Sequence, residues 1–265
     1  MSVTFPLFFE VLSEKGKVSG PVRRTLGPGI VLALLSACAA PPPPAAIHDP
    51  DEARNREIHA FNVGLDKYFL RPVATGYGAA VPVPVQRGVS NFASNIDLPG
   101  DVLNNLLQGR PGFAVENTFR FAVNTTVGIG GLFDPATAIG VPQRKTDFGE
   151  TLHVWGAGEG AYVELPALGP STERDAVGTI VDYALNPVGW LLHEPESYVA
   201  TAASVGSTLG DRSRYSATID SVLYDSADSY AQTRLLYLQN RRFELGQSAT
   251  NEDDFLDPYE DLDAE

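Results

Sequence analysis

The chain has 265 residues, a formal net charge of −14, one cysteine and four histidines. The acidic balance argues against a nucleic-acid-binding protein, because phosphates require a basic surface. A single cysteine excludes an intramolecular disulfide and a zinc site built on several cysteines, so this thiol needs another explanation.

The N-terminus has the layout of a secretory signal peptide, which we assign to residues 1–37. Basic residues precede an apolar run from Ile30 to Leu35, and this run is too short for a membrane-spanning helix of roughly 20 residues. Residues 1–20 exceed what a signal needs, which is consistent with a start codon assigned too far upstream.

The order Leu35-Ser36-Ala37-Cys38 resembles the lipobox of bacterial lipoproteins, in which the signal is removed before the cysteine and the new N-terminus is acylated. The resemblance predicts a covalent lipid on Cys38 and, since alanine follows, export to the outer membrane. The alternative is a small cysteine buried in a core helix, but four prolines from Pro41 onward would end such a helix. Residues 38–50 are therefore predicted to be a lipidated cysteine and a proline-rich tether.

Residues 51–246 show mostly helical patterns and are predicted to form one domain. A first amphipathic helix is predicted from Asp51 to about Arg71-Pro72, since apolar residues recur at helical spacing. Pro82 and Pro84 then break the chain, and the next short helix is predicted to close at Pro99-Gly100. Two further helices are predicted over 101–108 and 113–127, with a break at 109–112.

In the helix over 113–127, Glu116, Arg120 and Asn124 form one polar stripe at i, i+4 and i+8. Two interpretations stay open: a core helix with an ordinary Glu116–Arg120 ion pair, or a stripe that lines a polar passage. Gly128, Gly130 and Gly131 follow this helix. They are predicted to form a hinge or a tight turn, with a plain loop as the alternative, because glycine tolerates backbone angles that other residues resist.

The segment 128–170 is dense in glycine and proline and is predicted to be loops with short helices and no long strand. Thr172, three residues before Asp175, matches a capping box that starts a helix reaching Leu185. Helical patterns resume after Pro187 and again over 227–245. Because strands and helices do not alternate, the predicted fold class is mainly α.

The last predicted helix carries Arg234, Arg241 and Arg242. These arginines are predicted to contact phosphate head groups or an acidic partner, with a solvated basic face as the alternative. Residues 247–265 are predicted to be an acidic, disordered tail, because Asn251 to Glu265 contains eight acidic residues and no lysine or arginine.

Sequence motifs for catalysis and metal binding are missing. The glycine clusters at 128–131 and 156–160 lack the spacing of a phosphate loop, no serine lies in a GxSxG elbow, and the histidines form no HExxH pair. We therefore expect that the protein is not an enzyme, that it binds no metal, and that it has no cofactor besides the lipid on Cys38.

Several segments, in order and spacing, are similar to the MlaA/VacJ family of outer-membrane lipoproteins. They are "NREIHAFNVGLDKYFLRPVATGY", "VPVPVQRGVSNF", "NNLLQG", "RFAVNTTVGIGGLFDPA", "DFGETLHVWGAGEGAYVELPALGPSTERD" and "YLQNRR". The similarity extends from about Asn55 to Leu245, and it departs from the family at the long N-terminus and the acidic tail.

The resemblance implies a ring-shaped single domain of amphipathic helices with Gly/Pro-rich loops. This domain would lie in the outer membrane, anchored by lipid and inserted from the periplasmic side. As part of the intermembrane phospholipid transport system, it would remove mislocalised phospholipid from the outer leaflet through a central amphipathic channel. It would pass the lipid to a periplasmic MlaC-type carrier, maintain lipid asymmetry and associate with trimeric porins. Glu116, Arg120 and Asn124 would then line the channel.

Three other functions stay open. A structural lipoprotein could tether the envelope without moving lipid. A lipid hydrolase would need a nucleophile such as Ser90 or Ser171 within hydrogen-bond reach of a histidine in a pocket. A closed lipid-binding pocket would store one molecule instead of conducting it.

Overall fold

The structure is a computed structural model that describes residues 47–188 and 196–247. The chain divides into two compact units, residues 1–40 and 41–265, and all the described residues belong to the second unit. The predicted signal peptide over 1–37, Cys38, most of the predicted tether and nearly all of the predicted acidic tail lie outside the described residues.

Helices make up most of the described chain, which confirms the predicted mainly α fold. Between them lies one antiparallel pair of short strands. In chain order the elements are α2 (Glu52–Leu65), η1 (Asp66–Leu70), α3 (Arg71–Ala80), α4 (Val83–Leu107), α5 (Pro111–Thr126), α6 (Pro135–Ala138), α7 (Phe148–Val154), β1 (Tyr162–Leu165), β2 (Gly169–Thr172), α8 (Glu173–Leu185), α10 (Glu196–Arg214), α11 (Ser216–Leu223) and α12 (Ser229–Glu244).

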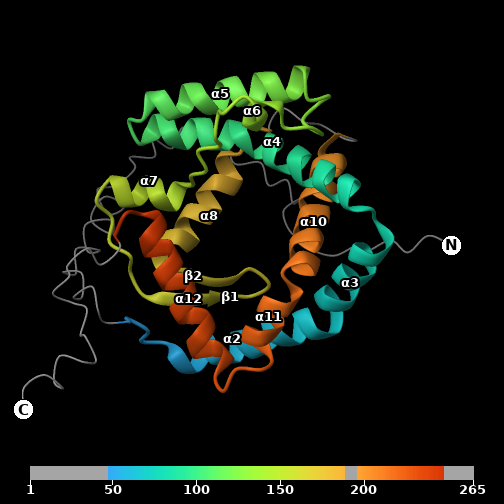
Figure 1. The fold of residues 1–265 in the computed structure, drawn as a ribbon. Helices are drawn as coiled ribbons and strands as arrows, with labels where there is room; N and C mark the ends of the chain where they lie inside the picture. Colours follow the sequence, from blue (N-terminus) through green and yellow to red (C-terminus); the bar gives the residue numbers. More distant parts are fainter. Residues whose placement is uncertain (1–46, 189–195, 248–265) are drawn as a thin grey trace, which may run out of the picture. The chain divides into compact units, whose positions relative to one another are not determined.

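Contacts between these elements close into a ring, as Figure 1 shows. From η1 the contacts run through α3, α10 and α4, pass by α7 and α8 to the strands, and return through α2 to η1. α5 packs on α4, while α12 packs on β2 and α11. Because each element contacts its neighbours around the ring, the buried apolar cluster is small and consists of Tyr162, Tyr230 and Leu238.

The first helix does not end near Pro72, so that prediction is wrong. α2 continues through the π-helical turn η1 into α3, and Pro72 lies in the first turn of α3. Proline is tolerated in a first turn, and a π turn shifts the hydrogen-bond partners by one residue, which accommodates its missing N–H.

The helix break predicted at Pro99 is also wrong, since α4 runs from Val83 to Leu107 with Pro99 inside it. Pro99 removes the hydrogen bond to the carbonyl of Asn95, which in an isolated helix costs about 3 kcal/mol. α4 packs against both α5 and α10, and we attribute the continuity of the helix to this packing. The break predicted at 109–112 is confirmed, because Gly109 has a φ of 70° and α5 begins at Pro111.

The segment 128–170 ends in a hairpin that the sequence pattern did not indicate. β1 and β2 pair with Tyr162 opposite Thr172 and Leu165 opposite Gly169. Asn55 of α2 supports β1, because its Nδ2 donates to the carbonyl of Tyr162 at 3.1 Å and its Oδ1 accepts from the amide of Glu164 at 3.0 Å. A neighbouring helix therefore specifies this short hairpin.

Side-chain caps start the helices that carry the polar cluster described below. The Thr172 hydroxyl accepts from the amide of Asp175 at 3.2 Å, which confirms the predicted cap of α8. Asp147 and Asp228 cap α7 and α12 in the same way, at 2.7 and 3.0 Å. Such caps stabilise a helix by roughly 1 kcal/mol each and determine where its first turn begins.

Candidate functional site

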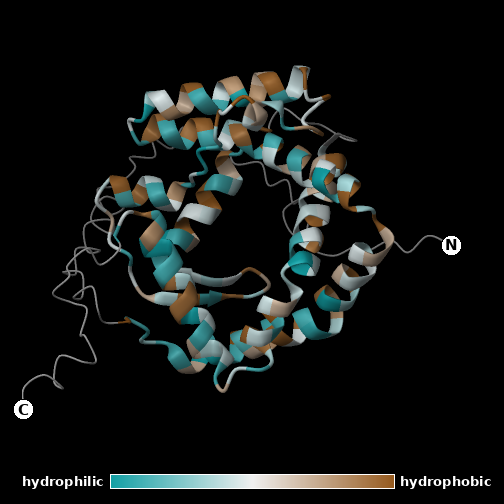
Figure 2. Cartoon of the chain, in the orientation of Figure 1, coloured by the Kyte–Doolittle hydropathy of each residue, from teal (hydrophilic) through white to brown (hydrophobic). Residues whose placement is uncertain are grey.

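The helices bury polar residues and expose apolar ones. Among the described residues, 20 buried side chains are polar or charged and 10 are apolar. This is the reverse of a water-soluble domain, whose fully buried positions are mostly apolar. Figure 2 shows hydrophobic residues distributed along the ring, including along α5.

The inversion is clearest in α5 and recurs in α8 and α12. In α5, Asn117 is fully buried whereas Val115 is 67% exposed and Phe119 is 46% exposed. The buried charged residues of α8 and α12 are Arg174, Asp175 and Arg241, and their exposed apolar residues are Val177, Ile180, Tyr183, Leu185, Leu235, Leu236 and Phe243.

Exposed apolar area of this extent is unfavourable in water, by roughly 25 cal/mol for each Å². Patches of this kind mark contact with lipid or with a protein partner. Among the helices that the structure describes, none combines the length and the hydropathy that crossing a bilayer would require.

The polar stripe predicted on α5 is divided between two environments. Arg120 and Asn124 are buried and donate to the two carboxylate oxygens of Asp134, at 2.9 and 3.0 Å, so they hold the loop that follows α5. Glu116 is partly exposed and pairs with Arg144 at 2.7 Å. The ordinary Glu116–Arg120 ion pair is therefore not the pairing that forms, and the channel-wall role of the three stripe residues stays a prediction.

Gly128, Gly130 and Gly131 lie in a tight turn after α5. Gly130 and Gly131 have φ values of 70° and 94°, which favour glycine. Gly128 has no room for a side chain, because an added Cβ would lie 2.4 Å from the carbonyl oxygens of Asn124 and Phe133. The predicted hinge function stays a prediction.

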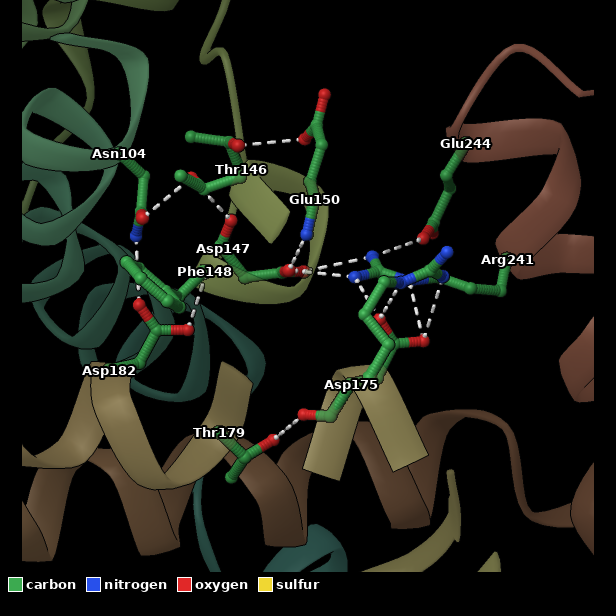
Figure 3. Close-up of polar contacts among 12 residues, drawn as sticks. Asn104, Thr146, Asp147, Phe148, Glu150, Asp175, Thr179, Asp182, Arg241 and Glu244 are labelled. Atoms are coloured by element: carbon green, nitrogen blue, oxygen red, sulfur yellow. Dashed lines mark hydrogen bonds and ion pairs between the residues drawn. The ribbon is translucent and has the colours of Figure 1, made fainter. Parts of the chain in front are cut away.

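Arg241 of α12 is the centre of a polar cluster that joins α7, α8 and α12. Its guanidinium donates to both carboxylate oxygens of Asp175, at 3.1 and 3.0 Å, and to both of Asp147, at 2.8 and 2.7 Å. Figure 3 shows the guanidinium between these two carboxylates, and Glu244 approaches it at 3.4 Å. One arginine thus connects the starts of two helices to the last helix.

Asp182 of α8 lies in the same cluster and has a different environment. Its carboxylate accepts from the amide of Phe148 at 2.8 Å and from Nδ2 of Asn104 at 2.8 Å (Figure 3). A cavity of about 240 Å³ opens here, and its lining includes Asp147, Asp175, Asp182, Tyr237, Arg241 and Glu244. Carboxylates outnumber cations in this lining, which disfavours an anionic ligand such as phosphate.

Two carboxylates of this cavity, the buried Asp175 and the half-buried Asp182, titrate differently. Burial raises the pKa of Asp175, but the hydrogen bonds and positive charge of Arg241 outweigh burial and lower the pKa to about 2. At Asp182 burial dominates and raises the pKa, although bonds from Phe148 and Asn104 favour the charged form. The cluster therefore contains a firmly ionised carboxylate beside one that protonates more readily than usual.

The other two arginines predicted to meet head groups or a partner are also paired within the chain. Arg234 donates to Asp49 and lies 3.4 Å from Glu52. Arg242 donates to both carboxylate oxygens of Glu159, at 3.0 and 2.8 Å. A guanidinium engaged with carboxylates has fewer donors left for a phosphate, and the predicted contacts of Arg234, Arg241 and Arg242 stay predictions.

Sequence reasoning missed Asp147 and Asp175 as partners of Arg241. Each of them lies at the start of a helix, which is a signal that the local sequence can carry. However, Asp147 is 94 residues and Asp175 is 66 residues from Arg241. Spacing along the chain cannot reveal such pairs. Within residues 47–188 and 196–247, no three histidine, cysteine or acidic side chains come close enough together to hold a metal ion.

Comparison with known proteins identifies the family. The family model described as "MlaA lipoprotein" matches residues 47–244. A protein of Rickettsia bellii is 38% identical over 196 residues, covering 74% of this chain and 76% of its own length. The Escherichia coli protein named "Intermembrane phospholipid transport system lipoprotein MlaA" is 36% identical over 202 residues, covering 74% of this chain and 77% of its own length.

A solved structure described as "Structural basis for maintenance of bacterial outer membrane lipid asymmetry" matches the fold with a TM-score of 0.64 and 33% identity. The match covers 74% of this chain and 98% of the solved chain. The resemblance inferred from the sequence segments is thereby confirmed, and the chain belongs to the MlaA lipoprotein family.

Proposed function

We propose that this protein is an outer-membrane lipoprotein that removes mislocalised phospholipid from the outer leaflet and so maintains lipid asymmetry. The observation that carries the proposal is the inversion of the helix faces within a ring: charged residues such as Arg120 and Asp175 are buried, while Phe119 and Tyr183 are exposed. Membership of the MlaA lipoprotein family, with relatives named for phospholipid transport, supports it.

The physical task is to move a molecule with a charged head and two apolar tails. Burying an unpaired polar group costs on the order of several kcal/mol. A ring of amphipathic helices avoids this cost if the head group moves through a central amphipathic channel while the tails stay against the apolar surface of the helices. Helices suit such a ring because their backbone hydrogen bonds are satisfied internally, so only side chains meet lipid. This transport involves no covalent change to the lipid.

For the channel wall we propose Glu116 first, because it is partly exposed, whereas Arg120 and Asn124 are buried and bonded to Asp134. In a strain that depends on the altered protein, Glu116→Ala should raise outer-leaflet phospholipid. Glu57→Ala is the matched control, since Glu57 is an exposed acid on α2. Equal levels of outer-leaflet phospholipid with the two variants would contradict a role for Glu116 in the channel wall.

We further propose that a lipid on Cys38 anchors the protein to the outer membrane from the periplasmic side. The support is the lipobox-like order before Cys38 and the apolar residues exposed on α5. Mass spectrometry of the membrane-extracted protein tests the anchor, because acylation adds a defined mass to the N-terminal cysteine. A membrane fraction that contains only unmodified Cys38 would contradict it.

A trimeric porin and a periplasmic MlaC-type carrier are the proposed partners. The exposed apolar side chains leave area for a membrane protein beside lipid. Purification from gently solubilised membranes should recover the porin, and a lipid-loaded carrier should appear only when the full chain is present. Recovery of the protein free of porin under several mild detergents would argue against that partner.

The decisive test is removal of the gene. Deletion should raise phospholipid in the outer leaflet and sensitise cells to detergent combined with a chelator, and the intact gene should restore both. Unchanged lipid together with a weakened envelope would instead favour a structural tethering lipoprotein.

A further inference from the structure

A serine, a histidine and a carboxylate line up across three elements on the α2 side of the ring. Ser229 opens α12, His59 lies in α2 and Glu164 in β1. The Oγ of Ser229 is 3.0 Å from Nε2 of His59, and Nδ1 of the same ring is 3.4 Å from Oε1 of Glu164. The order nucleophile, base and orienting carboxylate is the one that serine hydrolases use on unrelated folds.

The hydrogen bonds around Glu164 determine which nitrogen of His59 carries the proton. The carboxylate already accepts from Nδ2 of Asn62 at 3.1 Å and from the hydroxyl of Tyr162, so it acts as an acceptor. Nδ1 of His59 must then be the donor toward Glu164, which leaves the lone pair of Nε2 directed at Ser229. This is the tautomer in which histidine can take the proton of a serine hydroxyl.

The arrangement is rigid and the serine is accessible. His59 is 5% exposed and Glu164 is 3% exposed, and the His59 ring packs edge-on against Tyr230 with centroids 5.6 Å apart. Ser229 is only partly buried. A buried base and orienting group with a reachable nucleophile is what acyl transfer to serine requires.

A cavity of about 170 Å³ is lined by His59 and Glu164 together with Val63, Leu223 and Thr233, and Ser229, which is not part of this lining, reaches it through its bond to His59. The volume is several times that of a water molecule, and the valine and leucine side chains suit a hydrocarbon segment. The Thr233 hydroxyl is buried without a hydrogen-bond partner among the described residues. Thr233 lies one helical turn beyond Ser229 on the same face of α12, so its free O–H can donate to a developing oxyanion.

We propose that Ser229, His59 and Glu164 form a second functional site that hydrolyses carboxylic esters with an apolar acyl chain. The Ser229 oxygen attacks the ester carbonyl carbon while His59 Nε2 takes the hydroxyl proton. The bond from the carbonyl carbon to the alkoxy oxygen then breaks, and the alcohol leaves with that proton. Water, deprotonated by His59, attacks the acyl-serine, so the fatty acid is released and the hydroxyl of Ser229 is restored.

This activity goes beyond lipid transport and runs against the expectation that the chain is not an enzyme. The two serines considered from the sequence do not provide it, since Ser90 bonds to Ser207 and Ser171 to the carbonyl of Thr172. The pairing of Ser229 with His59 depends on residues 170 positions apart, so no sequence motif marks it.

The first test asks whether Ser229 is a nucleophile. The full-length protein in detergent is treated with a fluorophosphonate probe, which forms a stable adduct with an activated serine, and the adduct is mapped by mass spectrometry. We expect the adduct on Ser229, and we expect His59→Asn to reduce labelling at least about 100-fold. Circular dichroism of His59→Asn must match the parent. Absence of an adduct on Ser229 in the folded parent protein overturns the proposal.

The second test measures turnover of 4-nitrophenyl butyrate and of vesicles of phosphatidylethanolamine and phosphatidylglycerol, with fatty-acid release as the readout. Ser229→Ala should reduce turnover by about 1,000-fold or more. Ser226→Ala is the matched control, because the Ser226 hydroxyl bonds to the carbonyl of Val222 at 2.6 Å. The two substrates distinguish a soluble ester from a phospholipid as the source of the acyl chain.

Glu164 is a positioning residue in this proposal, and Glu164→Gln separates its role from a structural one. The amide keeps an acceptor but loses the charge that stabilises the protonated histidine, so kcat should fall at least about 100-fold with KM unchanged. Turnover that survives Ser229→Ala, or equal turnover by the Glu164→Gln variant and the parent, overturns the assigned triad.

Discussion

Arg241 and Asp175 form a two-pronged ion pair, with Nε donating to Oδ2 at 3.1 Å and Nη2 donating to Oδ1 at 3.0 Å. The pair links the last helix to the first turn of α8, and the same guanidinium reaches Asp147 at the start of α7. The helices α7, α8 and α12, which are far apart in the sequence, are thus joined by the guanidinium of Arg241. In a ring with a small apolar core, contacts of this kind carry much of the tertiary specificity.

Arg241→Ala should therefore destabilise the fold strongly. It leaves the buried carboxylate of Asp175 without its main partner, and breaking a buried pair from one side costs on the order of 3 kcal/mol. Thermal unfolding in detergent micelles measures the change. Arg214→Ala is the control, because the Arg214–Asp211 pair is exposed and 3.5 Å long, and such pairs contribute roughly 0–1 kcal/mol. Equal losses in the two variants would contradict a central role for Arg241.

Arg241→Ala should also change how the free energy of unfolding depends on pH in the acidic range. The pKa of Asp175 is lowered to about 2 in the folded protein, below its unfolded value of about 3.9. Stability from this group is therefore present above pH 4 and is lost as the pH falls toward 2. Arg241→Ala should flatten the profile in this window, as followed by unfolding at each pH.

Asp101 should have the opposite effect on the pH dependence of stability. Burial raises its pKa to about 6, although bonds from Gln143 and the amide of Thr146 favour the charged form. The folded state then holds the proton more tightly than the unfolded state between about pH 4 and 6, so stability falls as the pH rises through this window. Relative to the parent, Asp101→Asn should gain about 3 kcal/mol between pH 4 and pH 7.

Asp134→Asn provides the contrast for that measurement. Burial raises the Asp134 pKa, but bonds from Thr137, Asn124 and Arg120 outweigh it and lower the pKa. Removing this charge should therefore lower stability more at pH 7 than at low pH, the reverse of Asp101→Asn. Parallel pH profiles for the two variants would show that at least one of these carboxylates does not titrate as described.

The turn after α5 allows a test with two neighbouring glycines. Gly128→Ala would bring a Cβ within 2.4 Å of two backbone oxygens, whereas a Cβ on Gly130 meets no atom within 4 Å. Gly130→Ala should cost roughly 1–2 kcal/mol from its φ of 70° alone. Gly128→Ala should cost more, because backbone atoms must move. Denaturant unfolding ranks the two, and a larger loss for Gly130→Ala would contradict the structure of this turn.

The exposed apolar residues of α5 allow a test of membrane contact that does not depend on the proposed lipid on Cys38. In a Cys38→Ser background, Phe119→Asp combined with Val115→Asp should release the protein from vesicles, since each buried apolar side chain contributes roughly 1.5–3 kcal/mol. Vesicle flotation measures the bound fraction. Gln232→Asp, at an exposed position of α12, is the control, and equal release by the control would place α5 outside the membrane contact.

Several features of the fold could be predicted because their causes are local. The helix over 113–127, the break at Gly109 and the Thr172 cap depend on residues within a few positions of one another. The ends predicted at Pro72 and Pro99 were wrong because their causes are not local. A π turn accommodates the first proline, and packing of α4 against α5 and α10 accompanies the second.

The sequence by itself determined the family and the mainly helical fold, since these follow from ordered segments and helical spacing. The lipid on Cys38 stays a prediction from the lipobox-like order before it. Only the tertiary structure decided which charges meet. Arg120 pairs with Asp134 instead of Glu116, Arg241 joins Asp147 and Asp175, and Ser229 lies beside His59. The physical reason is that closing the ring brings together elements that lie far apart in the sequence. A side chain then pairs with the groups that are near it in space, and the spacing of residues along the chain does not reveal which groups these are.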